Sequence, residues 1–361
     1  MGSAEIGALR IEGLRNIDHV DIDIRGCAAL FSGGNGAGKT TILESIYLLA
    51  RGKSFRGRKS GELTSVGRER TKVDGVVADA WGGDARQICF VRHHSLMERW
   101  INGVVIGDSV GVASGFVVRL VCDGSYRLIE GDPGLRRGFL DLNLFHVEQG
   151  AGDLLMRFRR VLAQRNAWLR GGAVGVPIWD AAFVATGAEL QEARRRLFRE
   201  LDTEYRVLAS DFWFLGGSRL VLNCGWGEGR TLAEALLADA PGERTAGFTR
   251  VGPHRADFSV VGEWGELRLS RGQTKVLVCI LQLAFDRVQQ QRLGYGSIWL
   301  LDDVWAELDS ESSRALCGSF FDAGGQYLFT SVGGDAKLRK LDLPSDTRLF
   351  HVERGVVTDV S

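Results

Sequence analysis

The segment 33–40, GGNGAGKT, constrains the fold of this chain more than any other part of the sequence. It matches the pattern G-x-x-x-x-G-K-[ST], in which backbone N–H groups of a glycine loop surround phosphate oxygens at the start of a helix. An apolar run at 27–32 precedes the loop, and apolar residues at helical spacing follow it up to Ala50. A strand, a glycine loop and a helix in this order predict a nucleotide-binding α/β domain.

The loop also predicts which side chains hold the nucleotide. We expect Lys39 to reach the β- and γ-phosphates of ATP and Thr40 to ligate Mg²⁺. The residues expected to bind ATP are Gly33, Gly34, Asn35, Gly36, Ala37, Gly38, Lys39, Thr40 and Thr41.

Two acids follow a buried strand near the end of the chain. The stretch 298–303 reads IWLLDD, four apolar residues and then Asp302 and Asp303. Because buried carboxylates are costly unless a cation neutralises them, Asp302 is expected to anchor Mg²⁺ and Asp303 to polarise the attacking water. The simpler alternative is a strand that ends in a solvated acidic turn, and the glycine loop upstream disfavours it.

A second candidate anion site lies at 267–275, LRLSRGQTK, where Ser270, Gly272 and Gln273 stand at the start of an amphipathic helix. A serine hydroxyl and free N–H groups at a helix N-terminus can bind an anion. One chain does not need two cradles for one triphosphate, whereas in a symmetric dimer each copy can cap the γ-phosphate held by the other. The alternative is that Ser270 is only a helix cap.

The order of elements predicts an α/β ATPase head interrupted by helices. Residues 70–106 read as short antiparallel strands, 153–170 and 185–209 as helices, and 297–331 as strand, helix and strand. The glycine loop, LSRGQ (269–273) and LLDD followed by AELD also resemble the ATP-binding-cassette superfamily. This resemblance implies an ABC-type P-loop head, with a mixed sheet and an antiparallel subsheet, and a mainly helical second lobe. Lobe I is expected at 1–120 and 292–361, and lobe II, which carries the LSRGQ signature, at 121–291.

Composition limits the partners and the compartment. The 45 basic residues equal the 45 acidic ones, so DNA binding would require local basic patches. The six cysteines are scattered without a C-x-x-C pair, which is typical of a reducing cytosol. No apolar run approaches the roughly 20 residues of a membrane helix. These features predict a cytoplasmic protein without a membrane partner.

Several longer stretches together resemble the RecF family of bacterial DNA replication and repair proteins, within the ATP-binding-cassette superfamily. They follow the order of the family and span nearly the whole chain. They are LRNI (14–17), GGNGAGKTTILESIYLLARGKSFR (33–56), INGVVIG (101–107), GDPGLRRGFLD (131–141), LAQRNAWL (162–169), WDAAFVATGAEL (179–190), GFTRVGPHRADF (247–258), LSRGQTK (269–275) and LLDDVWAELD (300–309).

The resemblance implies an ATP-dependent homodimer that binds gapped duplex DNA and single-/double-strand junctions. It implies that RecO and RecR act with this dimer to load RecA, and that a weak, DNA-stimulated ATPase activity resets it. Asp303 would take the catalytic position with Lys39, and Asp302 the metal position. Ser270 would act across the dimer interface, and Asp309 would contact the partner copy.

The chain departs from the family pattern at a few positions. Cys122-Asp123 stands where Pro-Glu is usual, and Trp305 replaces a small residue beside the catalytic acid, where we expect altered packing or solvent access. The strand after the acids ends in Thr330-Ser331, without the histidine switch of transporter cassettes, as is ordinary for the family. His254 lies in the GPHR motif, with no role expected beyond positioning a loop.

The preferred DNA contact is the segment 51–59, RGKSFRGRK, and within it Arg56, Arg58 and Lys59. It has five basic residues and no acid, directly after the helix of the glycine loop, and each phosphate it neutralised would add salt-sensitive affinity. A solvated charged face is the alternative. For Arg136 and Arg137, a structural role is the alternative to a DNA contact. Further basic clusters are Arg157, Arg159, Arg160, Arg165 and Arg170, and Arg194–Arg196.

Other classes of protein remain as alternatives. A transporter-energising ATPase normally keeps the histidine switch. A chromosome-organising head of the SMC type requires a long coiled coil, and even an unbroken helix from Leu154 to Leu208 would span only about 80 Å. A non-enzymatic ATP-dependent scaffold would fit if Asp303 supports negligible turnover.

Overall fold

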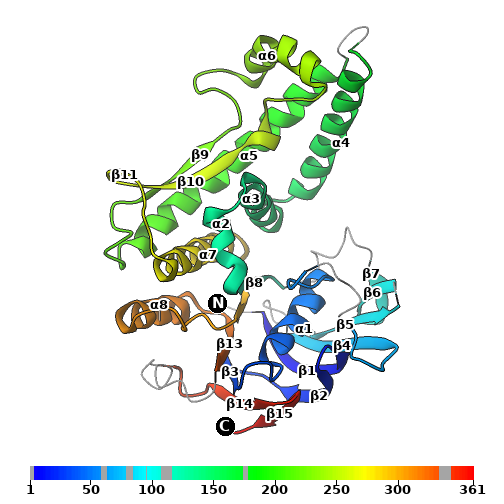
Figure 1. The fold of residues 1–361 in the computed structure, drawn as a ribbon, viewed down its shortest axis with the longest axis vertical. Coiled ribbons are helices and arrows are strands. Elements are labelled where there is room, and N and C mark those ends of the chain that lie inside the picture. The colour runs from blue at the N-terminus through cyan, green and yellow to red at the C-terminus, as the bar shows by residue number, and fades with distance from the viewer. Residues whose placement is uncertain are drawn as a thin grey trace. The chain divides into compact units, whose positions relative to one another are not determined.

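A computed structural model describes residues 4–57, 63–78, 84–94, 96–106, 116–173, 178–332 and 343–361. The chain forms two compact units (Figure 1). Unit 1 comprises Met1–Ser125 and Ser270–Ser361, and unit 2 comprises Tyr126–Leu269.

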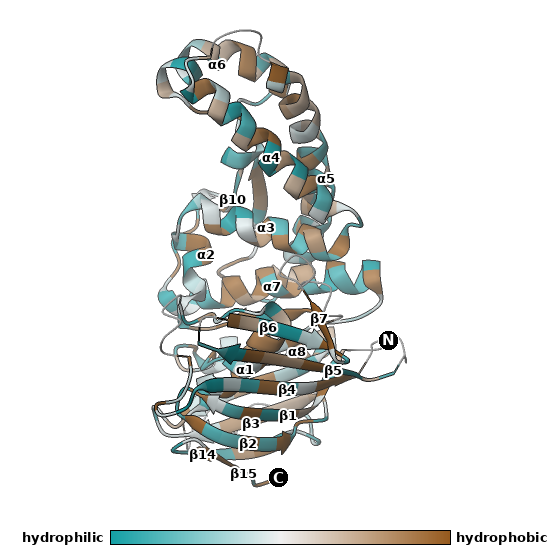
Figure 2. Cartoon of the chain, turned by 90° about the vertical axis from the view of Figure 1, so that its right-hand side faces the viewer, coloured by the Kyte–Doolittle hydropathy of each residue, from teal (hydrophilic) through white to brown (hydrophobic). Residues whose placement is uncertain are grey.

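One sheet of unit 1 is antiparallel, with strand order β2-β1-β4-β5-β6-β7. The strands are β1 (Glu5–Leu14), β2 (Ile17–Asp23), β4 (Arg70–Ala78), β5 (Arg86–His93), β6 (Leu96–Ile101) and β7 (Val104–Ile106). Buried and more exposed residues alternate along β4, as in a strand with one face on the core. Asn102 and Gly103 both have positive φ (49° and 80°) in the β6–β7 turn, the conformation that Asn-Gly adopts in tight hairpins. Figure 2 shows this sheet face-on.

The second sheet of unit 1 is mixed, with strand order β15-β14-β3-β13-β12-β8. The strands are β3 (Ala28–Gly33), β8 (Val118–Val121), β12 (Ile298–Leu301), β13 (Gln326–Val332), β14 (Arg348–Glu353) and β15 (Val356–Asp359). All neighbours pair in parallel except β14 and β15. Every residue of β12 is buried, which explains its uninterrupted apolar sequence. The mixed sheet and the antiparallel subsheet confirm the predicted fold class.

Helix α1 (Lys39–Arg51) joins the two sheets into one core. Its apolar residues Ile42, Ile46 and Leu49 are fully buried and belong to the same cluster as side chains from both sheets. Each large apolar side chain buried in this cluster stabilises unit 1 by about 1.5–3 kcal/mol. The helix begins directly after the glycine loop, so the core fixes the position of that loop.

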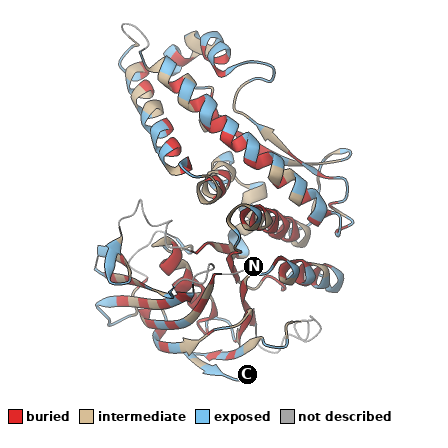
Figure 3. Cartoon of the chain, turned by 180° about the vertical axis from the view of Figure 1, so that it is seen from behind, coloured by how far each residue is buried: buried red, intermediate tan, exposed pale blue. Residues whose placement is uncertain are grey.

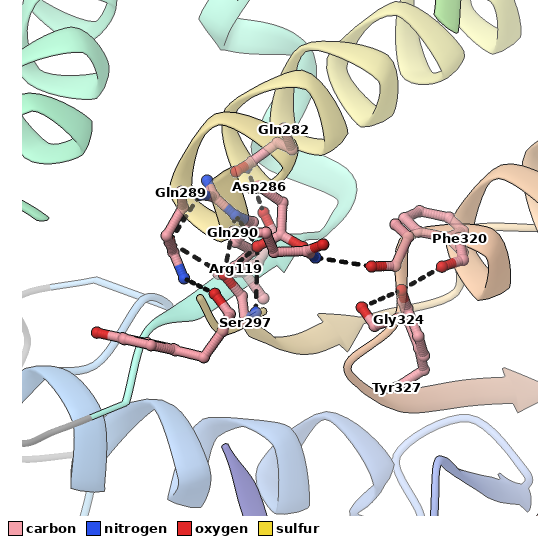
Figure 4. Close-up of polar contacts among 12 residues, drawn as sticks. Arg119, Gln282, Asp286, Gln289, Gln290, Ser297, Phe320, Gly324 and Tyr327 are labelled. Atoms are coloured by element: carbon pink, nitrogen blue, oxygen red, sulfur yellow. Dashed lines mark hydrogen bonds and ion pairs between the residues drawn. The ribbon is translucent and has the colours of Figure 1, made fainter. Parts of the chain in front are cut away.

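Helix α7 (Arg271–Leu293) is buried along most of its length, as the red ribbon in Figure 3 shows. A buried guanidinium, that of Arg119 on β8, connects α7 with the mixed sheet (Figure 4). Arg119 Nε donates to Asp286 Oδ1 (3.1 Å) and to Ser297 Oγ (3.0 Å). Burial lowers the pKa of Arg119, and the Asp286 carboxylate acts in the opposite direction.

The same helix is also connected to α8 (Ser310–Ala323), because Gln290 Nε2 donates to the carbonyl of Ala323 at 2.7 Å. These contacts explain why residues 270–291 group with unit 1. The sequence predicts these residues in lobe II, because spacing alone does not reveal what a buried helix packs against.

Unit 2 is mainly helical, with a small antiparallel sheet in the order β11-β10-β9. Its elements are α2 (Arg127–Glu130), α3 (Pro133–Val147), α4 (Ala151–Arg170), α5 (Ile178–Ala209), β9 (Arg219–Asn223), α6 (Leu232–Ala246), η3 (Pro253–Arg255), β10 (Asp257–Gly262) and β11 (Gly265–Glu266), while η2 (Asp123–Tyr126) spans the boundary between the units. Helices α4 and α5 lie where the sequence predicted helices.

Several arginines of the predicted basic clusters are structural. Arg165 is 2% exposed. Its Nε donates a hydrogen bond to Asp180 Oδ1 (2.7 Å), and its Nη2 donates one to Glu243 Oε2 (2.6 Å). Arg194, also 2% exposed, donates to Asp141 Oδ1 at 2.8 Å. Neither side chain is accessible to DNA, so the clusters at 157–170 and 194–196 are not uniformly solvated basic faces.

The RRGFLD and GPHR motifs are connected inside unit 2. Arg136 donates from two nitrogens to the carboxylate of Asp257 (2.6 and 2.9 Å), and Arg137 donates to the carbonyl of Ala256 (2.9 Å). Burial lowers the pKa of His254 to about 4, and its Nε2 lies 2.9 Å from the carbonyl oxygen of Thr249. His254 is therefore neutral at pH 7 and packs in the interior, consistent with a loop-positioning role.

Among the described residues, no helix combines the length and the apolar character that a membrane crossing requires.

We predict that Arg119→Met lowers the free energy of unfolding by about 3–5 kcal/mol, because it leaves Asp286 as an uncompensated buried carboxylate. Urea denaturation followed by circular dichroism measures the loss. Arg10→Met is the matched control: Arg10 also pairs with an aspartate, Asp21, but is 53% exposed, so its effect should be several-fold smaller. Equal losses in the two variants would contradict the expectation that the unpaired Asp286 carboxylate is costly because it is buried.

A candidate nucleotide-binding site in unit 1

The glycine loop closes between β3 and α1 in the way its sequence predicts. Gly36 and Gly38 have φ of 75° and 122°, a region that side-chain-bearing residues rarely adopt. Gly33 is required by a steric constraint, since a Cβ at this position would lie 2.1 Å from the carbonyl oxygen of Val352. Gly34, Asn35 and Gly36 are exposed, so this part of the loop is open to a ligand.

Lys39 starts α1 and is almost fully buried, with 8% of its surface exposed. Its Nζ donates to the carbonyls of Gly33 and Gly34, each at 2.8 Å, and the loop therefore holds the ammonium in place. Burial lowers the pKa of Lys39, while Asp303 and Asp302 oppose the shift. The structure thus brings the loop lysine and the two predicted acids into one electrostatic environment.

A chain of hydrogen bonds joins Thr40, Asp302 and Thr330. Thr40 Oγ1 donates to the Asp302 carboxylate, with oxygen–oxygen distances of 3.0 and 3.1 Å. Thr330 Oγ1 donates to Asp302 Oδ1 at 2.7 Å and accepts the backbone N–H of Asp303 at 2.9 Å. Thr330, at the place of the histidine switch, therefore links the predicted metal acid to the predicted catalytic acid, a role that sequence reasoning missed.

The donor set around Thr40 fits Mg²⁺, which prefers oxygen ligands and keeps several waters and phosphate oxygens in its shell. The Thr40 hydroxyl and the Asp302 carboxylate are the protein groups that would hold it, Asp302 from the outer sphere. Among the described residues, no three His, Cys, Asp or Glu side chains gather into an all-protein metal site.

Asn16 and Gly355 support the loop from outside the motif. Asn16 Nδ2 donates to the carbonyl of Gly36 (3.1 Å), and its Oδ1 accepts from Thr41 Oγ1 (3.0 Å). Gly355, in the β14–β15 turn, donates its N–H to the carbonyl of Ala37 at 2.8 Å. Asn16 belongs to the LRNI stretch, but only the fold shows that it contacts the loop.

A cavity of about 300 Å³ lies over the loop, lined by Arg15, Asn16, Gly36, Ala37, Gly38, Lys39, Thr40, Thr41 and Arg56. Arg15 pairs with the fully buried Glu44, its Nη2 at 2.7 Å from Oε1. Arg56 lies at 3.8 Å from the same carboxylate and is 42% exposed. The structure thus places Arg56 in the wall of the nucleotide cavity, and its predicted contact with DNA stays a prediction. Arg58 and Lys59 lie outside the described residues.

The signature residues form a helix cap at the start of α7. Ser270 Oγ accepts the N–H of Gln273 (3.3 Å), and Gln273 Oε1 accepts the N–H of Ser270 (2.9 Å). Gly272 is required by a close approach, since a Cβ there would meet the carbonyl oxygen of Glu307 at 2.7 Å. Ser270 is exposed, so capping leaves it accessible.

The loop after the acids has local structural roles as well. Asp309 caps α8, accepting the N–H of Ser312 at 2.7 Å and its hydroxyl at 2.9 Å, and these bonds lower the pKa of Asp309. Its predicted contact with a partner copy stays a prediction. Trp305 is 1% exposed and packs against Phe320 and Phe329, so its side chain is part of the core, and its predicted effect on solvent access to the acid stays a prediction.

The glycine loop joins β3 to α1, the two acids follow β12 in the same sheet with β13 between the two strands, and α7 begins at a capped signature. These features define a P-loop ATPase head of the ABC and SMC type. A family model described as an AAA domain matches residues 8–85. The fold is similar to a solved RecF–ATP structure of the RecFOR pathway, with a TM-score of 0.81, 22% identity and coverage of 99% of this chain and 98% of that one. An Smc head bound to the C-winged helix domain of ScpA gives a TM-score of 0.61 at 14% identity, covering 98% and 97%.

The chain is 31% identical over 356 residues to the DNA replication and repair protein RecF of Pseudomonas entomophila, covering 97% of both chains. It is 32% identical over 359 residues to the RecF protein of Pseudomonas fluorescens strain Pf0-1, covering 98% of both. The chain belongs to the RecF family of DNA replication and repair proteins, as its sequence motifs predicted.

We predict that Gly355→Ala weakens ATP binding roughly tenfold or more, because overpacking of about 1–3 kcal/mol would displace the loop. A Cβ at Gly355 would lie 2.2 Å from the carbonyl oxygen of Asn16. Isothermal titration with ATP measures the change. Gly67→Ala is the control, since its φ of 81° nearly equals the 82° of Gly355 and no atom lies within 4 Å of its added Cβ. Equal affinities of the two variants would mean that Gly355 does not support the site.

Proposed function

We propose that this protein is an ATP-dependent DNA-binding protein of recombinational repair and replication that acts as an ATP-driven homodimer. The proposal rests on one observation: the residues expected to contact the triphosphate form two separate groups in the chain. Thr40 is hydrogen-bonded to Asp302 and Lys39 lies in the field of both acids, whereas Ser270 caps the exposed start of another helix. In a symmetric pair, Ser270 of each copy would cap the γ-phosphate held by the other.

Hydrolysis in this scheme uses groups whose positions support the assignment. Lys39 binds the β- and γ-phosphates, and Asp303 holds and polarises the attacking water. Mg²⁺, when bound at Thr40 and near Asp302, supplies positive charge that neutralises the phosphates. We expect a weak, DNA-stimulated conversion of ATP to ADP and phosphate that resets the dimer. A non-enzymatic scaffold would bind ATP and dimerise without this conversion.

Family membership supports the DNA and protein partners that we propose. Relatives carry the name DNA replication and repair protein, and a solved RecF–ATP complex is described within the RecFOR pathway. We propose that the dimer clamps gapped duplex or single-/double-strand junctions in the cytoplasm and, with RecO and RecR, promotes loading of RecA on single strands. A transporter-energising role and a chromosome-organising role are disfavoured, the latter because the longest described helix, α5, has 32 residues and spans only about 48 Å.

We expect Lys39→Ala to abolish ATP binding and dimer formation, since it removes the main cation from the phosphates. Asp303→Asn should still bind ATP and should accumulate as a dimer, because the water is no longer polarised. Light scattering with and without ATP measures the mass, and phosphate release with gapped DNA measures turnover. An Asp303→Asn protein that remains monomeric under saturating ATP would contradict the shared-site model.

The basic segment after α1 allows nucleotide and DNA contacts to be separated. Arg58→Ala/Lys59→Ala should weaken junction binding and reduce the slope of affinity against salt by about two, one for each lost phosphate contact. Arg56→Ala should mainly weaken ATP binding, because Arg56 lines the nucleotide cavity. Fluorescence anisotropy on gapped DNA at several salt concentrations tests both variants. An unchanged salt slope in the double variant would remove this segment from the DNA interface.

A further inference from the structure

The main chain of Asp303 is held in an unusual conformation. Its φ is 51°, in the left-handed region, which costs a residue with a side chain on the order of 1 kcal/mol or more. Both of its backbone polar groups are bound by side chains from other elements. Its N–H donates to Thr330 Oγ1 (2.9 Å), and its carbonyl accepts from Lys275 Nζ (3.0 Å).

Lys275 lies near the start of α7, a little over one turn beyond the cap residue Ser270. It is 9% exposed, an unusual burial for a lysine, which is normally tolerated only when the ammonium has polar partners. Those partners are the Asp303 carbonyl and the carboxylate of Glu307, 4.0 Å away. A hydrogen bond from a charged donor is about twice as strong as a neutral one, so this contact can maintain a strained backbone.

Further contacts join the start of α7 to the segment 302–309. Arg271 Nε lies 3.4 Å from Glu307 Oε1, and Arg271 Nη2 lies 2.7 Å from Asp123 Oδ1. The backbone at Gly272 packs so closely on the carbonyl of Glu307 that a side chain would not fit. The two segments are therefore joined at Arg271, Gly272 and Lys275, and a shift of the helix start would be transmitted to Asp303.

We propose that Lys275 is a positioning residue that fixes the main chain of Asp303 and couples the signature end of α7 to that acid. The inference rests on the proposed function, in which Asp303 serves the nucleotide bound by its own chain and Ser270 serves the nucleotide of the partner copy. Engagement of Ser270 by the partner's γ-phosphate then acts on Asp303 through Lys275. Each copy is competent for hydrolysis only when its signature helix is engaged.

The test compares Lys275→Met, which keeps the length and apolar body of the side chain, with Lys275→Arg, which keeps a charged donor. Lys275→Met should reduce kcat for DNA-stimulated phosphate release by about tenfold or more, because misplacement of a catalytic group by about an ångström has such costs. KM for ATP and the ATP-driven doubling of mass should stay within about twofold of wild type. Lys275→Arg should recover a substantial part of kcat.

The matched control is Lys72→Met, a lysine that pairs with Asp74 on β4 and lies outside the site. It should leave kcat and KM unchanged. If Lys275→Met does not fold, as judged by circular dichroism, Thr330→Val and Thr330→Ser give the second test. Valine removes the acceptor of the Asp303 N–H and should lower kcat without preventing dimer formation, whereas serine keeps the hydroxyl and should retain activity.

The outcomes separate the two proposals. Wild-type kcat in Lys275→Met, with normal turnover and dimer formation in wild type, overturns the positioning role alone. A loss of ATP binding or of dimer formation in a folded Lys275→Met protein overturns it as well, because it would indicate a structural role. A wild-type protein that neither dimerises with ATP nor releases phosphate overturns the proposed function and the positioning role together.

Discussion

The hydrogen-bond chain Thr40–Asp302–Thr330 is the interaction on which the arrangement of unit 1 depends. It connects the first turn of α1 with the ends of β12 and β13, and Thr40 and Asp302 are 262 positions apart in the chain. Parallel neighbouring strands place their carboxyl ends at one edge of the sheet, so the acids and the glycine loop meet there. The hydroxyl groups of Thr40 and Thr330 donate to the Asp302 carboxylate at this edge and stabilise it. The core around α1 keeps these donors in register.

Buried arginines explain why a neutral chain rich in basic residues does not present uniformly basic faces. Arg119, Arg165 and Arg194 are all at most 4% exposed and are bound to carboxylates of other elements. A guanidinium can make several hydrogen bonds in a fixed plane, which suits a position where several elements meet. Charge runs in the sequence therefore combined surface and interior arginines, and the sequence offered no signal that distinguishes them.

Helix α7 has two roles that follow from its place in unit 1. Its buried body is fixed by Arg119 and Gln290, while the exposed cap Ser270 precedes its first turn and the buried Lys275 follows that turn. When a partner contacts the exposed start of a rigid helix, a shift of that start also displaces the residues packed against it. Here these residues belong to the segment that carries Asp303. The boundary expected near residue 291 concealed this connection, because it separated the signature from the acids.

The sequence by itself determined the elements and groups that local rules govern. The glycine pattern marked the loop, an apolar run marked β12, helical periodicity marked α5, and the order of motifs identified the RecF family. The tertiary structure alone decided which distant groups meet: Gly355 beneath the loop, Arg56 in the cavity wall, Thr330 between the two acids and Lys275 on the carbonyl of Asp303. The reason is physical, since hydrogen-bond patterns and periodicity act within a few residues, whereas these contacts arise only when the packing of two sheets around α1 and α7 brings distant segments together.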